Sequence, residues 1–170
     1  MKNKKSIEFS DKLLYDGINN KEEVLNMLLR NCAGGVVFYE DKVFILKNEK
    51  DEWILPKGKI QSGNLAIETA KIKVKEETGL ENIQIVSPAG ETNYEFYSLS
   101  RKKPVCNEII WFIMEAKSLE YDIKSKEFKN GGFYEIQEAI EKITYSQDKS
   151  LVRLSHKKYL KLKNENLAIV

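Results

Sequence analysis

The stretch from Trp53 to Leu80 constrains the fold more than any other part of the chain. It reads as a short apolar strand, a loop that contains Gly58 and Gly63, and a helix that stops at Gly79. Pro56 ends the strand because it has no backbone N–H to donate to a neighbouring strand. Glycine is common just after the last helical residue, since it tolerates the left-handed conformation there. The pattern therefore predicts a strand, a loop and a helix in close succession.

The helix predicted before Gly79 has two different faces, and Asn64 is the candidate for its N-cap. The apolar residues fall on one stripe of a helical wheel: Ala66, Ile67, Ala70 and Val74. Lys73, Glu76 and Glu77 are spaced three and four residues apart, so they lie together at the edge of that stripe. Charges placed beside the backbone N–H groups of a Gly-rich loop can hold a phosphate-rich ligand. The sequence thus predicts a phosphate site where the loop meets the end of the helix.

The spacing of this stretch resembles the signature of the Nudix hydrolase superfamily, which includes the MutT-like proteins. That signature is a glycine, five residues, Glu, seven residues, and then Arg-Glu-apolar-x-Glu-Glu-x-Gly-apolar. Gly58 opens the pattern without a gap, and its second half is filled by Val74, Glu76, Glu77, Gly79 and Leu80. The resemblance implies an α/β Nudix fold, in which a mixed sheet lies between helices. It also implies hydrolysis of a pyrophosphate linkage.

Three positions depart from the signature, which makes the Nudix box degenerate. Asn64 replaces its first Glu, Ile72 its Arg, and Lys73 the Glu after that Arg. In family members the helix glutamates bind Mg²⁺ or Mn²⁺, which bridges the pyrophosphate and activates a water. By this resemblance Glu76 and Glu77 are the metal ligands and catalytic residues. Lys73 would either oppose binding of a divalent cation or stand in for it.

Further candidate site residues come from the loop and from two strands. Lys57 and Lys59 flank Gly58, and all three are candidate substrate contacts, although exposed loop lysines are common. Glu108 is the candidate for a remote catalytic carboxylate, acting as a metal ligand or as a base, and an ordinary charge at a strand edge is the alternative. Tyr94 could stack on a nucleobase, but aromatic residues at strand spacing more often cover a sheet.

The second half of the chain extends the resemblance to the branch of diadenosine-polyphosphate hydrolases. The motifs that carry it are Gly90-x-Thr92-x-Tyr94-x-Phe96, Phe133-Tyr134 and Glu138-Ala139. Strands are expected over residues 33–39, 43–47, 83–86, 92–99 and 108–117, and helices over 138–143 and 146–162. Gly131 and Gly132 are expected to separate the last strand from these helices. The superfamily resemblance covers roughly residues 33–155.

Residues 32–170 are predicted to form a single domain. Residues 1–31 are predicted to be an N-terminal extension with a short strand and a helix over 20–30. This extension is either a packed decoration, a contact in a homodimer or a wall on the substrate side. The formal net charge of +2 gives no field strong enough to point to nucleic acid or a membrane surface. Cys32 and Cys106 form no CxxC motif, which favours structural thiols in the cytoplasm.

Two functions remain open on the sequence alone. The first is a hydrolase that cleaves a pyrophosphate linkage in a nucleoside diphosphate derivative with a divalent metal. The second is a catalytically weak or inactive Nudix domain that binds a nucleotide or a protein partner. The near-neutral charge disfavours a nucleic-acid-binding module.

Overall fold

The computed structural model describes residues 26–168 of the chain. Contacts divide the chain into two compact units. Among the described residues, the larger unit comprises residues 31–93 and 108–168, and the smaller one comprises residues 26–30 and 94–107. Most of the predicted N-terminal extension lies outside the described residues, so its role stays a prediction.

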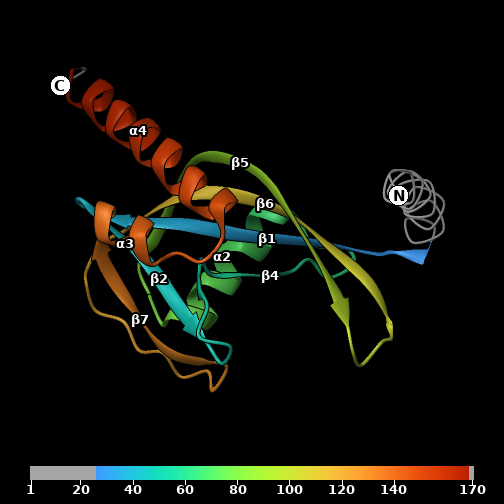
Figure 1. The fold of residues 1–170 in the computed structure, drawn as a ribbon. Helices are drawn as coiled ribbons and strands as arrows, with labels where there is room; N and C mark the ends of the chain where they lie inside the picture. Colours follow the sequence, from blue (N-terminus) through green and yellow to red (C-terminus); the bar gives the residue numbers. More distant parts are fainter. Residues whose placement is uncertain (1–25, 169–170) are drawn as a thin grey trace, which may run out of the picture. The chain divides into compact units, whose positions relative to one another are not determined.

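The elements follow in this order (Figure 1): β1 (Leu28–Tyr39), β2 (Lys42–Asn48), β3 (Trp53–Ile54), β4 (Lys57–Lys59), α2 (Ala66–Thr78), β5 (Ile83–Ser98), β6 (Lys103–Ala116), β7 (Phe128–Glu135), α3 (Ile136–Lys142) and α4 (Ser146–Ala168). The strands form one sheet in the order β3-β2-β1-β6-β5, in which β4 also pairs with β1 and β7 with β2. α2 packs on one face of this sheet, and α3 and α4 pack on the other. The predicted α/β architecture, a mixed sheet between helices, is confirmed.

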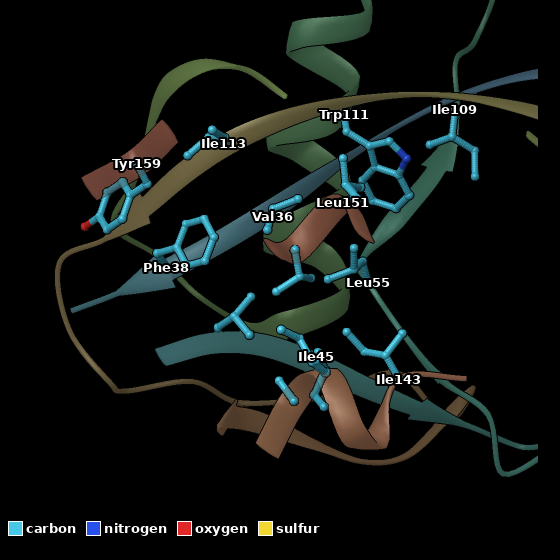
Figure 2. Close-up of a cluster of buried hydrophobic side chains, with 14 of the residues drawn as sticks. Val36, Phe38, Ile45, Leu55, Ile109, Trp111, Ile113, Ile143, Leu151 and Tyr159 are labelled. Carbon is cyan, nitrogen blue, oxygen red and sulfur yellow. The ribbon is translucent and has the colours of Figure 1, made fainter. Parts of the chain in front are cut away.

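Alternation along the central strand builds two apolar cores, because successive side chains of a strand point to opposite faces. Val36 and Phe38 of β1 belong to the core beneath α3 and α4, which Figure 2 shows. In that core the ring of Phe38 stacks on Tyr159 of α4, with 4.9 Å between the centroids. Val37 belongs instead to the core beneath α2, where it joins Val74. Helices on both faces therefore bury β1 at the centre of the sheet.

α2 ends as the sequence predicts but begins one residue later. Gly79 has φ 73° and its N–H bonds to the carbonyl of Lys75, so the C-terminal glycine is confirmed. The N-cap is Leu65, without a side-chain hydrogen bond, so the prediction of Asn64 as the cap is wrong. The reason is a turn in which the Asn64 N–H bonds to the carbonyl of Gln61 at 3.1 Å.

Two predicted element assignments are wrong. The helix expected over 20–30 does not reach its predicted end, since β1 already begins at Leu28. The two strands expected over 83–86 and 92–99 form one continuous strand, β5. Long-range pairing in a sheet overrides local preference in such segments.

The two glycines expected to end the last strand lie inside it. Gly131 and Gly132 are part of β7 and pair with Leu46 and Ile45 of β2. A Cβ built on Gly132 would lie 2.6 Å from the Tyr121 Oη. The absence of a side chain at Gly132 therefore lets the Tyr121 ring pack closely against the strand, and glycine in strands often marks such a close approach.

The smaller unit contains a tight hairpin turn between β5 and β6. The Arg101 N–H donates to the Ser98 Oγ at 3.3 Å, and Lys102 has φ 51°. On the strand before this turn, the rings of Tyr94 and Phe96 stack with 5.6 Å between centroids.

No helix within residues 26–168 is both long enough and apolar enough to cross a membrane. Both cysteines, Cys32 and Cys106, have buried side chains.

Candidate functional site

The site is centred on the junction between β4 and α2. β4 pairs with β1 through Ala33 opposite Gly58 and Gly34 opposite Lys57. The backbone N–H of Lys57 donates to the Glu77 Oε2 at 3.0 Å. This hydrogen bond joins residues twenty positions apart and ties the glycine loop to the last turn of the helix. The sequence prediction that these two parts meet is therefore correct.

Lys73 lies across this junction. Its Nζ is 2.9 Å from the Glu76 Oε2, and its aliphatic stem passes over Gly58. A Cβ built on Gly58 would lie only 2.4 Å from the Lys73 Cδ. Because Gly58 has no side chain, the aliphatic part of Lys73 can pack against its backbone without a clash. The ammonium neutralises one of the two carboxylates that the resemblance assigns to a metal.

Glu77 is an ionisable group in a partly dry position. Burial raises its pKa to about 7, against the opposing effects of the hydrogen bond from Lys57 and the charges of Lys57 and Lys73. The negative charge of Glu127, just before β7, raises the pKa further. The positive charges near Glu77 therefore do not fully offset the effect of its burial. A cation bound beside the carboxyl would favour its ionised form.

The ammonium of Lys57 interacts electrostatically with carboxyls from three different segments: Glu52, Glu77 and Asp148. Lys57 itself is half-buried. The charge of one half-buried lysine therefore acts on several acids.

Two of these acids differ in how well they are bonded. Glu52 accepts hydrogen bonds from the Asn48 Nδ2 at 2.9 Å and the Tyr145 hydroxyl at 2.8 Å. Burial works to raise the pKa of Glu52, but these bonds outweigh it and lower the pKa. Burial raises the pKa of Asp148, in the first turn of α4, to about 6, and the charge of Lys57 opposes that effect.

The predicted site residues divide into two groups. Glu76, Glu77, Lys57 and Gly58 meet at the β4–α2 junction. Lys59 is exposed and lies opposite Cys32 in the β1–β4 ladder.

Glu108 lies in another part of the larger unit. Glu108 lines a cavity of about 460 Å³ together with Asn31, Glu91 and Asn93, and neither Glu76 nor Glu77 lines it. Tyr94 belongs to the smaller unit. The roles proposed for both residues stay predictions.

Sequence reasoning missed three acids near the junction: Glu52, Glu127 and Asp148. Each of them has an electrostatic or hydrogen-bonding partner more than twenty positions away in the sequence, so the sequence alone does not bring the two together. The sequence did indicate that Asp148 lies in the first turn of a helix, because it follows the predicted helix start at Ser146 and acids are common in that position. Only the fold brings this turn within reach of the charge of Lys57.

No group of three or more His, Cys, Asp or Glu side chains within residues 26–168 is arranged to hold a metal ion. The available donors at the junction are Glu76 and Glu77. Glu77 suits a cation because nearby positive charges do not offset its burial. Glu76 could bind a cation only if its ion pair with Lys73 were broken.

Comparison with known families and curated proteins gives consistent results. The family model described as NUDIX domain matches residues 24–154. An RNA pyrophosphohydrolase of Pelagibacter ubique is 32% identical over 114 residues, which are 60% of this chain and 72% of that protein. The asymmetrical bis(5'-nucleosyl)-tetraphosphatase of Rattus norvegicus is 29% identical over 146 residues, which are 76% of this chain and 95% of the rat protein.

Solved structures share the fold. An Ap4A hydrolase of C. elegans, in a binary complex, superposes with a TM-score of 0.59 at 19% identity, covering 77% of this chain and 97% of that one. A NUDIX hydrolase of Nitrosomonas europaea gives a TM-score of 0.60 at 17% identity, covering 76% and 89%.

Proposed function

The chain belongs to the NUDIX domain family, and from that premise we propose that it hydrolyses the pyrophosphate linkage of a nucleoside diphosphate derivative. The observation that carries the proposal is the junction of β4 and α2, where Glu77 binds the N–H of Lys57 at 3.0 Å. The named activities of the RNA pyrophosphohydrolase and the tetraphosphatase support this substrate class.

We assign Glu76 and Glu77 to a divalent cation, Mg²⁺ or Mn²⁺. Glu77 fits this role because its pKa is raised to about 7 by burial, with Glu127 adding to the negative charge. A hard cation prefers such oxygen ligands. When bound, the cation would neutralise charge on the phosphates and activate a water molecule.

The remaining candidates bind the substrate. The ammonium of Lys57 and the backbone around Gly58 face the phosphates, since both border the carboxylate of Glu77. Lys59 is exposed and free to contact an outer phosphate. Tyr94 remains the candidate for stacking on the nucleobase.

A second function has one observation in its favour. The Lys73 Nζ sits 2.9 Å from the Glu76 Oε2, so an internal cation already neutralises one expected metal ligand. In that case the domain is catalytically weak or inactive and binds a nucleotide, or a protein partner, without turnover.

One experiment separates the two functions. The pure protein is incubated with nucleoside triphosphates, dinucleoside polyphosphates and nucleotide sugars, with Mg²⁺ or Mn²⁺, and products are assayed. We expect turnover that Glu77→Gln abolishes. The matched control is Glu68→Gln, which removes an exposed acid of the same helix and should leave turnover intact. Nucleotide binding without turnover, insensitive to a chelator, would instead establish the binding module.

A further inference from the structure

The divalent cation of the proposed hydrolysis has few ligands in the protein itself. Within residues 26–168, no three His, Cys, Asp or Glu side chains are grouped to hold a metal ion. The junction of β4 and α2 offers two carboxylates, those of Glu76 and Glu77. Mg²⁺ is commonly held by one or two carboxylates together with phosphate oxygens of the substrate. A site with two carboxylates therefore depends on the substrate for its remaining ligands.

One of these two carboxylates already has a cationic partner. The Lys73 Nζ donates a hydrogen bond to the Glu76 Oε2 at 2.9 Å, and the two groups form an ion pair. The charge of Lys73 also acts on Glu77. Because like charges repel, this ammonium opposes a divalent cation at the same two carboxylates. Glu76 becomes a metal ligand only when Lys73 moves away from it.

The stem of Lys73 lies directly against the glycine loop. A Cβ built on Gly58 would lie 2.4 Å from the Lys73 Cδ, 2.6 Å from the Cγ and 2.9 Å from the Cε. The Nζ is bonded to this Cε, so rotation about the Cδ–Cε bond moves the ammonium and leaves the rest of the stem in place. An anion bound over Gly58 would therefore lie within reach of the ammonium.

Solvent reaches both partners of the ion pair. The Lys73 side chain is 31% exposed and the Glu76 side chain 57%. Ion pairs that are open to water contribute little to stability, so Lys73 can exchange one anion for another at small cost. A phosphate suits this exchange, because lysine is a common phosphate-binding residue.

We propose that Lys73 binds a phosphate of the substrate and releases Glu76 in doing so, which makes Glu76 available to the divalent cation. This inference rests on the proposed function. Without substrate, Lys73 pairs with Glu76. With substrate, Lys73 pairs with a phosphate over Gly58, and Glu76 and Glu77 are both free of its ammonium. Only hydrogen bonds and ion pairs are exchanged.

The exchange couples the binding of metal to the binding of phosphate. By linkage, a ligand that raises the affinity for Mg²⁺ by some factor has its own affinity raised by Mg²⁺ by the same factor. Such factors are commonly about 5- to 150-fold. A diphosphate also contacts the metal directly, and that part of the coupling does not involve Lys73. The contribution of Lys73 is therefore the difference between wild type and a variant without the ammonium.

The test measures Mg²⁺ binding by titration calorimetry with and without methylenediphosphonate, a diphosphate analogue whose bridging carbon prevents hydrolysis. Lys73→Met removes the charge and keeps an apolar stem over Gly58. We expect this variant to bind Mg²⁺ about five-fold more tightly than wild type when no analogue is present. Without metal, it should bind the analogue about five-fold more weakly. The factor by which the analogue raises Mg²⁺ affinity should fall by about five-fold.

Two further variants serve as controls. Lys71→Met removes the same charge from an exposed position of α2 and should leave these affinities close to those of wild type. Lys73→Arg keeps a cation on the stem and should keep most of the coupling. Mg²⁺ and the analogue associate in solution to the same extent with every variant, so this association cancels in the comparison. Thermal unfolding of each variant checks that it is folded.

The outcomes separate this inference from the proposed function. Equal coupling in wild type and Lys73→Met overturns the exchange, even if the wild type turns over its substrate. An affinity for the analogue without metal that Lys73→Met leaves unchanged also overturns it, because Lys73 then does not bind phosphate. Coupling that Lys73→Met lowers and Lys71→Met retains supports the exchange. A wild type that shows this coupling but no turnover on the substrate panel overturns the hydrolysis alone and leaves the exchange to a nucleotide-binding domain.

Discussion

Lys73 is the residue on which metal binding depends. Reversing its charge with Lys73→Glu removes the ammonium from Glu76 and adds a carboxylate. Near a protein surface, two unit charges at 4 Å interact by about 4 kcal/mol, so we expect Mg²⁺ affinity to rise by about ten-fold or more. Titration calorimetry with Mg²⁺ measures this directly.

The controls for this prediction isolate the charge. Lys71→Glu makes the same change at an exposed position of α2 and should alter Mg²⁺ affinity little. Lys73→Met keeps an apolar stem over Gly58 and should give an intermediate gain. Unchanged affinity in Lys73→Glu would show that the ammonium does not compete with the cation.

The residues of the junction show what a sequence can and cannot predict. The grouping of Lys73, Glu76 and Glu77 follows from helical spacing and was correct, because it depends on one element alone. The effect of the Lys57 charge on Asp148 could not be predicted, because it depends on how α4 docks on the sheet. Helical periodicity also misplaced Ile67, which is 40% exposed.

At the scale of elements, α4 is attached by a cluster of polar groups at the end of β6. Glu115 accepts hydrogen bonds from the hydroxyl of Tyr159, from the Lys117 Nζ at 2.7 Å and from the Lys163 Nζ at 3.2 Å. Burial alone would raise the pKa of Glu115, but these partners outweigh it and lower the pKa to about 2. The ionised carboxylate therefore stabilises the folded state.

We expect Glu115→Gln to lower the free energy of unfolding by up to about 3 kcal/mol at neutral pH, since each pKa unit corresponds to 1.36 kcal/mol. Because the folded-state pKa is depressed, the stabilisation is complete above the ordinary value of 4.5 and is lost as pH falls toward about 2. Urea unfolding of both proteins between pH 2 and 7 measures the difference.

An exposed pair on the same helix provides the comparison. Glu165 lies 4.0 Å from Lys161, so Glu165→Gln should change stability by less than about 1 kcal/mol. A difference between wild type and Glu115→Gln that persisted at pH 2 would contradict the assignment.

Element boundaries were predictable where local chemistry sets them and not elsewhere. Gly79 ends α2 because the left-handed conformation there suits glycine, and this could be foreseen. The continuity of β5 from Ile83 to Ser98 could not, since it depends on pairing with β6. The same pairing logic explains why β7 runs through Gly131 and Gly132.

For the whole molecule, two buried acids, Glu77 and Asp148, lower the free energy of unfolding when they are ionised. Burial raises the pKa of Glu77 to about 7 and that of Asp148 to about 6. Both groups are therefore more easily protonated when folded than when unfolded. Natural proteins commonly accept such a cost where function requires it.

The sign of the resulting pH dependence follows from linkage. A carboxyl whose folded-state pKa is raised gives its full contribution below the unfolded value, which is 4.5 for Glu77 and 3.8 for Asp148. That contribution is lost as pH rises through about 6 for Asp148 and about 7 for Glu77. We expect the free energy of unfolding to fall between about pH 4 and 7 and to level off above that range.

Replacing both acids should remove this loss. The double variant Glu77→Gln with Asp148→Asn mimics the protonated groups, so at pH 8 it should be more stable than wild type, by about 1–3 kcal/mol per site. At pH 4 the two proteins should differ little. Added Mg²⁺ should raise the stability of wild type at pH 8 and leave the double variant unaffected. A double variant less stable than wild type at pH 8 would mean that the ionised acids support the fold, and the charge imbalance inferred for the site would be wrong.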